Sequence, residues 1–203
     1  MHQPLIIGIT GGIGSGKTTL ADCLREVGYN VYDSDLEARR LQNENPIIRQ
    51  RLIQLFGEEI YTSLGLNRPL LAKIVFAKQE ILSQLNHIVH PVVETDFKNW
   101  ISQYSSEQFL FMESAILFES GFNKLVDRTV LMTAVEQIRI NRVIKRDHVS
   151  LEQVKARMAN QFPDEVKIPL ADIVIHTDDN LPMIDKMRKL LVQLSGYSLK
   201  IDC

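Results

Sequence analysis

Apolar residues along this chain follow two periods, and the alternation between them outlines the fold. Short, mainly apolar runs of strand length occupy residues 5–10, 29–32, 108–113, 129–134 and 171–176. Runs without a regular polar alternation are typical of strands covered on both faces, as in a parallel sheet. Between and after these runs, apolar residues recur every three or four positions, which predicts helices. The pattern therefore predicts an α/β fold built on a parallel sheet.

The first apolar run leads into a glycine-rich loop. Residues 11–18 read Gly-Gly-Ile-Gly-Ser-Gly-Lys-Thr and fit the phosphate-binding pattern G-x-x-x-x-G-K-[ST] at every required position. Apolar residues then recur at helical spacing: Leu20, Cys23, Leu24 and Val27. Strand, glycine turn and helix are the context that this motif requires. The sequence therefore predicts the three-layer fold of P-loop NTPases.

The chemistry of such a loop follows from its backbone. Glycines adopt positive φ, so successive N–H groups and the positive end of the next helix can converge on phosphate oxygens. We expect Lys17 to reach the β- and γ-phosphates of ATP and Thr18 to hold Mg²⁺. The predicted nucleotide contacts in this loop are Gly12, Ile13, Gly14, Ser15, Gly16, Lys17, Thr18 and Thr19.

Acidic residues follow two of the predicted strands. Asp33 and Asp35 come directly after the second strand, and Glu113 ends the third. Ligands bind at the carboxyl ends of the strands in open parallel sheets, so these acids are functional candidates. Either aspartate could instead cap the helix that begins near Leu36. Asp33 is the stronger candidate for chemistry, and Asp35 for the cap.

From Pro46 to about Tyr104 the alternation stops, and the pattern becomes helical. We expect an inserted helical region without strands. Residues 65–69 supply turn residues and a proline suited to the first turn of the next helix. Pro91 has no N–H and disfavours helical geometry at His90, so the longest helix should kink or restart there. By position alone, His90 is interpreted more readily as structural than as a ligand.

The segment after the fourth strand is rich in basic residues: Arg139, Arg142, Lys145, Arg146, Lys155, Arg157 and Lys167. Such a run is usually a solvated face, but in a nucleotide enzyme a mobile basic segment can close over phosphates. The chain then adds a last short strand and an amphipathic helix. The apolar face of that helix consists of Ile184, Met187, Leu191 and Leu194.

Composition narrows the class of protein. The chain has 203 residues, of which 45% are hydrophobic and 24% are charged, and its net charge is −2. This balance favours one domain with insertions and argues against nucleic-acid or membrane binding. Cys23 and Cys203 provide neither a metal-binding spacing nor a disulfide framework. Without a signal-peptide pattern or a run of transmembrane length, the sequence predicts a cytoplasmic protein.

Several separated motifs together resemble the dephospho-coenzyme A kinase family, and the resemblance spans essentially the whole chain. The matching motifs are residues 8–18, Asp33-Ser34-Asp35 with Arg39, Leu66-Asn67-Arg68 with Val75-Phe76, His90-Pro91, Leu117-Phe118-Glu119, and Gln137 with Arg142, Arg146-Asp147, Arg157 and Gln161. The resemblance implies a single P-loop kinase domain over residues 1–203. It also implies a helical substrate-binding insertion at about 58–106 and a lid at about 136–167.

The resemblance also implies an activity, the transfer of the γ-phosphoryl group of ATP to the ribose 3′-hydroxyl of dephospho-coenzyme A. In that reaction Asp33 would accept or orient the hydroxyl proton, while Lys17 and Mg²⁺ would neutralise charge. Arg142 would be the first lid arginine and Arg146 the second.

The resemblance also implies roles for three further residues. Glu113 would hold a metal-bound water, and Arg68 with His90 would form the acceptor's pocket. No obligate protein partner is implied.

Two positions depart from the family pattern, and two alternative functions stay open. Ala115 replaces a family proline, which affects local loop geometry, and Thr177 replaces a family asparagine near the adenine site. A nucleoside monophosphate kinase or another small-molecule kinase would share the loop, the lid and the insert. A GTP-dependent switch would need an N-K-x-D motif, and residues 123–127 have one residue too many for it.

Overall fold

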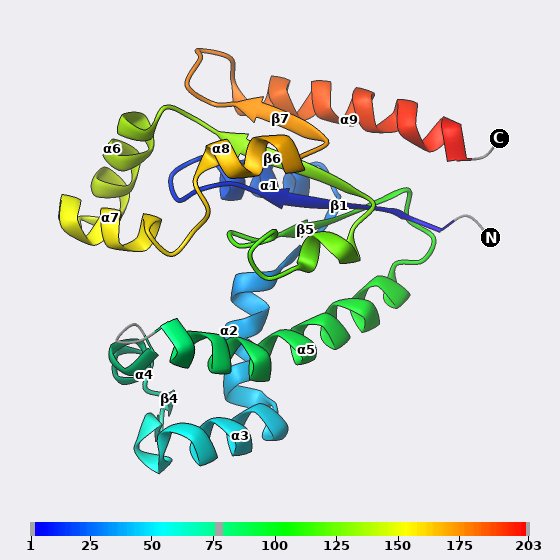
Figure 1. The fold of residues 1–203 in the computed structure, drawn as a ribbon. Helices are drawn as coiled ribbons and strands as arrows, with labels where there is room; N and C mark the ends of the chain where they lie inside the picture. Colours follow the sequence, from blue (N-terminus) through cyan, green and yellow to red (C-terminus); the bar gives the residue numbers. More distant parts are fainter. Residues whose placement is uncertain (1–2, 76–78, 202–203) are drawn as a thin grey trace. The chain divides into compact units, whose positions relative to one another are not determined.

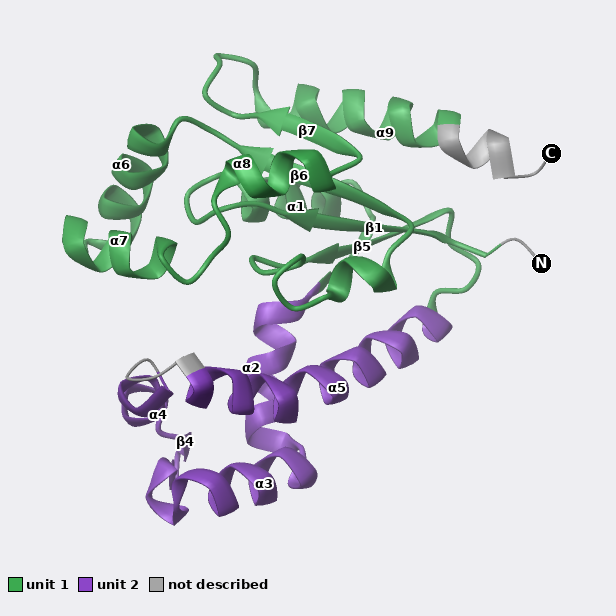
Figure 2. Ribbon diagram, in the orientation of Figure 1, with its two compact units in different colours: residues 1–32, 104–203 green, residues 33–103 purple. Residues whose placement is uncertain are grey.

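The structure is a computed structural model that describes residues 3–75 and 79–201. Phe76 and Cys203, which entered the sequence analysis, lie outside these described residues. The chain forms two compact units, one of residues 1–32 with 104–203 and the other of residues 33–103 (Figure 2).

A five-stranded sheet forms the centre of the first unit (Figure 1). Its strands are β1 (Leu5–Thr10), β2 (Asn30–Asp33), β5 (Phe109–Glu113), β6 (Arg128–Thr133) and β7 (Ile173–His176). Their order is β2-β5-β1-β6-β7, and β1 pairs in parallel with both β5 and β6, while β6 pairs in parallel with β7. Every residue of β5 is buried, as its unbroken apolar pattern predicts. The predicted α/β fold with a parallel sheet is confirmed.

Two helices cover one face of this sheet. They are α1 (Lys17–Glu26) and α9 (Met183–Ile201), which pack against each other. Figure 1 shows α1 behind the sheet and α8 (Asp164–Lys167) in front of it. The core between α1, α9 and the sheet includes Leu20, Leu24, Met187, Leu190 and Leu194. Val27 is not part of it, because it lies at the C-cap of α1 and is 50% exposed.

Further elements belong to the first unit. They are η2 (Phe122–Leu125), α6 (Glu136–Asp147), α7 (Leu151–Met158) and η3 (Ile168–Leu170). α6 and α7 bury Ile140, Val143 and Val154 between them. A capping box formed by Ser150 and Gln153 begins α7. Among the described helices, none is both long and apolar enough to cross a membrane.

The second unit contains α2 (Ser34–Glu44), α3 (Pro46–Phe56), η1 (Glu58–Ile60), α4 (Arg68–Val75) and α5 (Gln79–Gln103). It also contains an antiparallel hairpin of β3 (Tyr61–Thr62) and β4 (Gly65–Leu66), so the prediction of helices without strands was wrong here. Gly65 turns the chain at a φ of 103°, and the Thr62 hydroxyl accepts a hydrogen bond from Leu64 N. Strands of two residues are too short to produce a period-two pattern in the sequence.

α5 continues through Pro91, so of the two predicted outcomes, a kink or a restart of the helix, the restart is wrong. A proline inside a helix removes one backbone hydrogen bond and crowds the preceding turn. The buried face of α5 includes Val89, Val93 and Phe97. The helix contacts α2, α3 and α4 of the same unit. We infer that burial of this face outweighs the local cost of Pro91.

Candidate active site

The phosphate loop has backbone conformations that glycine tolerates best. Gly11, Gly14 and Gly16 have φ angles of 150°, 79° and 95°. A Cβ at Gly14 would collide with the backbone carbonyl of Arg139, so this position also lacks room for a side chain. Gly16 is the N-cap of α1, and no side chain in the described part of the chain caps the helix there. The N–H groups of the first turn of α1 are therefore placed to bind an anion.

Thr177, one of the two residues that depart from the family pattern, is hydrogen-bonded to the phosphate loop. It is buried, and its Oγ1 lies 2.9 Å from Ser15 O and 3.2 Å from Thr133 O, so its single hydroxyl hydrogen can bond either carbonyl. Arg142 donates to Thr177 Oγ1 at 2.9 Å and to Thr177 O at 2.5 Å. Arg142 also donates to Gly14 O at 3.3 Å. The structure thus brings the first predicted lid arginine to the phosphate loop.

Thr18 and Glu113 meet at the start of α1. The Thr18 hydroxyl donates to Glu113 Oε1 at 2.7 Å, and Glu113, the last residue of β5, is only 5% exposed. Ser114 N donates to Ile9 O at 2.9 Å and so fixes the chain beyond Glu113 to β1. A hydroxyl beside a carboxylate is a set of hard oxygen ligands that suits Mg²⁺ with substrate phosphates. Lys17 is half-buried at the first position of α1.

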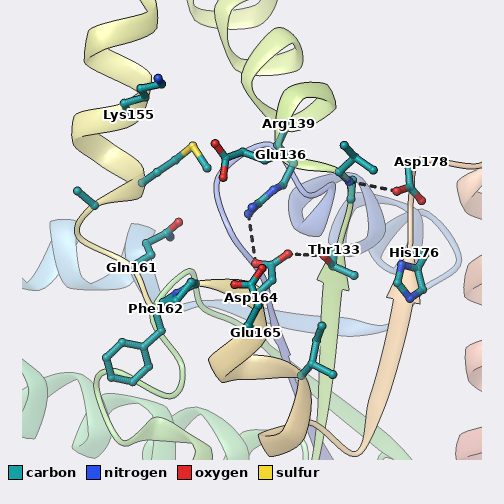
Figure 3. A pocket seen from close by; sticks show the side chains of 16 residues that line it. Thr133, Glu136, Arg139, Lys155, Gln161, Phe162, Asp164, Glu165, His176 and Asp178 are labelled. Carbon is teal, nitrogen blue, oxygen red and sulfur yellow. Dashed lines mark hydrogen bonds and ion pairs between the residues drawn. The ribbon is translucent and has the colours of Figure 1, made fainter.

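A cavity of about 630 Å³ lies beside the phosphate loop, and buried charges form one wall of it (Figure 3). Arg139 Nη1 is 3.3 Å from Asp164 Oδ1, and their side chains are only 9% and 12% exposed. Thr133 donates its hydroxyl to Asp164 Oδ2. A Cβ at Gly12 would collide with the Arg139 guanidinium, so the pair packs directly against the loop.

Lys167 is the second buried cation of the basic segment. It is fully buried, and its Nζ lies 3.1 Å from Glu119 Oε1. The solvated-face interpretation is therefore wrong for Arg139 and Lys167. From the sequence, both were named only as members of the basic run. The regular spacing of apolar residues on α6 was the one sequence signal that Arg139 faces inward.

The remaining lid arginines form an exposed cluster at the end of α6. Arg146 Nε and Arg157 Nη1 lie 2.7 and 2.8 Å from the Asp147 carboxylate. The hydrogen bond from Arg146, and then that from Arg157, lower the pKa of Asp147. Arg146, the second predicted lid arginine, is 62% exposed. Among the described residues, its side chain donates hydrogen bonds to Asp147 and not to the phosphate loop.

In the second unit, Asp33 ends β2 and caps α2. Its Oδ1 accepts from Leu36 N at 2.9 Å, so the cap interpretation is confirmed for Asp33 and was wrong for Asp35. The reason is that α2 begins at Ser34, two residues earlier than expected, and the capping residue directly precedes the first helical residue. Asp33 does lie at the carboxyl end of its strand, as predicted.

The two predicted acceptor-binding residues lie on different helices of this unit. Arg68, in the first turn of α4, donates to Gln42 Oε1 and to Arg39 O, both at 2.9 Å. Burial, and then the charge of Arg39, lower the pKa of Arg68. His90 is half-buried on α5, and burial followed by the nearby His87 lowers its pKa. His90 therefore favours the neutral imidazole.

Comparison with known proteins places this geometry in a family. A family model described as dephospho-CoA kinase matches residues 5–182. A dephospho-CoA kinase of Bacteroides fragilis is 41% identical over 188 residues, which are 93% of this chain and 92% of that protein. A crystal structure from Thermus thermophilus has a TM-score of 0.84 at 36% identity and covers 95% of this chain and 98% of its own. A Campylobacter jejuni dephospho-CoA kinase shares the fold, with a TM-score of 0.70, 23% identity, and 94% and 97% coverage.

Proposed function

We propose that this chain, which belongs to the dephospho-CoA kinase family, transfers the γ-phosphoryl group of ATP to the ribose 3′-hydroxyl of dephospho-coenzyme A. The products would be coenzyme A and ADP, and the reaction would be the last step of coenzyme A biosynthesis. The observation that supports this best is the phosphate loop, in which Lys17 and the uncapped start of α1 offer positive charge to a triphosphate.

On the nucleotide side, the transition state mainly requires positioning and neutralisation of charge. Lys17 and loop amides other than that of Ile13, which donates to the Gln161 side chain, would bind the β- and γ-phosphates. Arg142, already next to the loop, would neutralise negative charge that develops on the bridging oxygen. Thr18 and Glu113 would hold Mg²⁺, whose positive charge offsets that of the phosphate oxygens. Arg146 would join the phosphates after leaving Asp147.

On the acceptor side, Asp33 would orient the 3′-hydroxyl and accept its proton. Its cap bond uses Oδ1, so we assign this role to Oδ2. Arg68 and His90 would bind dephospho-coenzyme A, Arg68 through charge and His90 as a neutral hydrogen-bonding group. We propose that the acceptor-binding region expected at about 58–106 belongs to the unit of residues 33–103, and that α6, α7 and α8 form the lid.

A coupled assay of ADP release tests the reaction. The purified chain should release ADP from ATP only when dephospho-coenzyme A and Mg²⁺ are both present, and the product should carry a 3′-phosphate by mass spectrometry. AMP and shikimate serve as control acceptors, and GTP as a control donor. Absence of acceptor-dependent turnover with dephospho-coenzyme A would refute the proposal. Turnover with AMP alone would favour the nucleoside monophosphate kinase alternative.

A further inference from the structure

Gln161 connects two loops of the nucleotide site that are far apart in the sequence. Its Oε1 accepts from Ile13 N at 2.9 Å, and its Nε2 donates to Ala115 O at 3.1 Å. Ile13 lies at the centre of the phosphate loop, and Ala115 lies two residues beyond Glu113. Figure 3 shows Gln161 on the segment that joins α7 to α8. We propose that Gln161 is a positioning residue that holds the phosphate loop in its nucleotide-binding conformation.

The phosphate loop needs an external partner at this point. Ile13 stands between Gly12 and Gly14, and glycine restricts the backbone less than any other residue. The loop's own bond from Ser15 N to Gly12 O closes a single turn, at 3.1 Å. Hydrogen bonding of Ile13 N–H to a side chain outside the loop therefore selects one of several accessible conformations.

The chemistry of the side chain matches this task. An N–H group requires an acceptor and a carbonyl requires a donor, and a primary amide offers one of each in a single plane. The two partners also determine which end of the amide is oxygen. The next residues of the same segment are anchored as well, since Phe162 N donates to Glu119 Oε1 at 2.7 Å and Asp164 pairs with Arg139. Gln161 is thus held on a fixed piece of backbone.

The inference rests on the proposed function, because it assumes that the loop binds ATP. Loss of the bridge should weaken nucleotide binding and leave acceptor binding unchanged. Gln161→Met removes both hydrogen bonds at similar volume. Asn160→Ala is the matched control, since the neighbouring Asn160 is exposed and, among the described residues, its side chain bonds only Ala156 O, at 2.9 Å.

Isothermal titration with Mg-ADP and steady-state kinetics measure the effect. Gln161→Met should raise the Kd of ADP and the KM of ATP by roughly tenfold, the amount expected for losing two ordinary hydrogen bonds in a partly exposed site. The KM of dephospho-coenzyme A should match that of Asn160→Ala, and the melting temperature of the nucleotide-free protein should fall by only a few degrees, because the variant loses two hydrogen bonds. If Gln161→Met binds ADP as tightly as this control, the inference is wrong.

Gln161→Glu provides a second readout that a purely structural role would not change. A protonated carboxyl has the acceptor and the donor of an amide, whereas a carboxylate cannot donate to Ala115 O. Relative to wild type at the same pH, its ADP affinity should therefore recover as the pH falls from about 8 to about 5, toward the ordinary range of glutamate. Absence of this recovery would contradict the bridge.

Measurements on wild type distinguish a failure of the proposed reaction from a failure of the role proposed for Gln161. If wild type binds Mg-ADP but does not phosphorylate dephospho-coenzyme A, the proposed reaction fails while the ADP titrations still decide the role of Gln161. If wild type is active and Gln161→Met is unchanged, only the role of Gln161 fails. A wild-type chain that binds no Mg-ADP overturns both.

Discussion

The buried pair of Arg139 and Asp164 should be far more sensitive to mutation than an exposed pair of the same length. We consider Arg139→Met, which keeps the apolar stem of the side chain and removes its charge. The lost contact is 3.3 Å long, between side chains that are 9% and 12% exposed. Among the described residues, the Asp164 carboxylate would then keep only the Thr133 hydroxyl as a partner.

The size of the loss in stability follows from the burial of the Asp164 carboxylate, which remains without its cation. Breaking one side of a buried ion pair costs about 3–5 kcal/mol, and we expect about 3 kcal/mol because Asp164 keeps some solvent contact. For a chain of this size, about 3 kcal/mol lowers the melting temperature by about 6–12 °C. On α9, Arg188 and Asp185 are also 3.3 Å apart, but their side chains are 71% and 40% exposed. Arg188→Met should therefore cost about 0–1 kcal/mol.

Thermal and urea unfolding of the two variants and wild type measure this difference. Adding Asp164→Asn to Arg139→Met should restore part of the lost stability, because no buried charge then lacks a partner. Equal melting temperatures for Arg139→Met and Arg188→Met would refute the reasoning. A double variant as unstable as the sum of its single changes would also refute it.

Three further results are expected from the proposed roles. Asp33→Asn keeps a good N-cap and loses the carboxylate, so ADP titration should be normal while kcat falls by about 100-fold or more; normal turnover would remove the catalytic role of Asp33. Arg142→Ala should lower kcat by about 100-fold or more in the coupled assay, and an unchanged kcat would move the lid role to another arginine. Burial lowers the pKa of His90 in the folded state, so the unfolded chain takes up its proton first as pH falls. Stability measured by urea unfolding should therefore decrease below about pH 6.5 more in wild type than in His90→Gln, and equal pH dependence would contradict it.

Much of the fold was predictable because strands in a two-sided sheet and helices beside them leave strong local patterns. The sheet strands were each predicted to within two residues at either end, and the start of α1 followed from the phosphate loop. The hairpin of Thr62 and Gly65 was missed because its strands are too short for any period. The sequence left open whether the helix restarts at Pro91, because local rules count the lost hydrogen bond but not the buried face that compensates for it.

The candidate site, like the fold, was predictable from the sequence only in part. The sequence alone determined the family, through motifs spread along the chain. It also determined the phosphate loop and the acids that end β2 and β5, since each of these is written in consecutive residues. Only the tertiary structure decided that Arg139 and Lys167 are buried, that Thr177 fastens the loop and that Gln161 bridges it. The partners of Gln161 are 148 and 46 residues away, and no local periodicity records contacts across such distances. A buried cation and a solvated one look alike in sequence, because burial depends on what the rest of the chain packs around them.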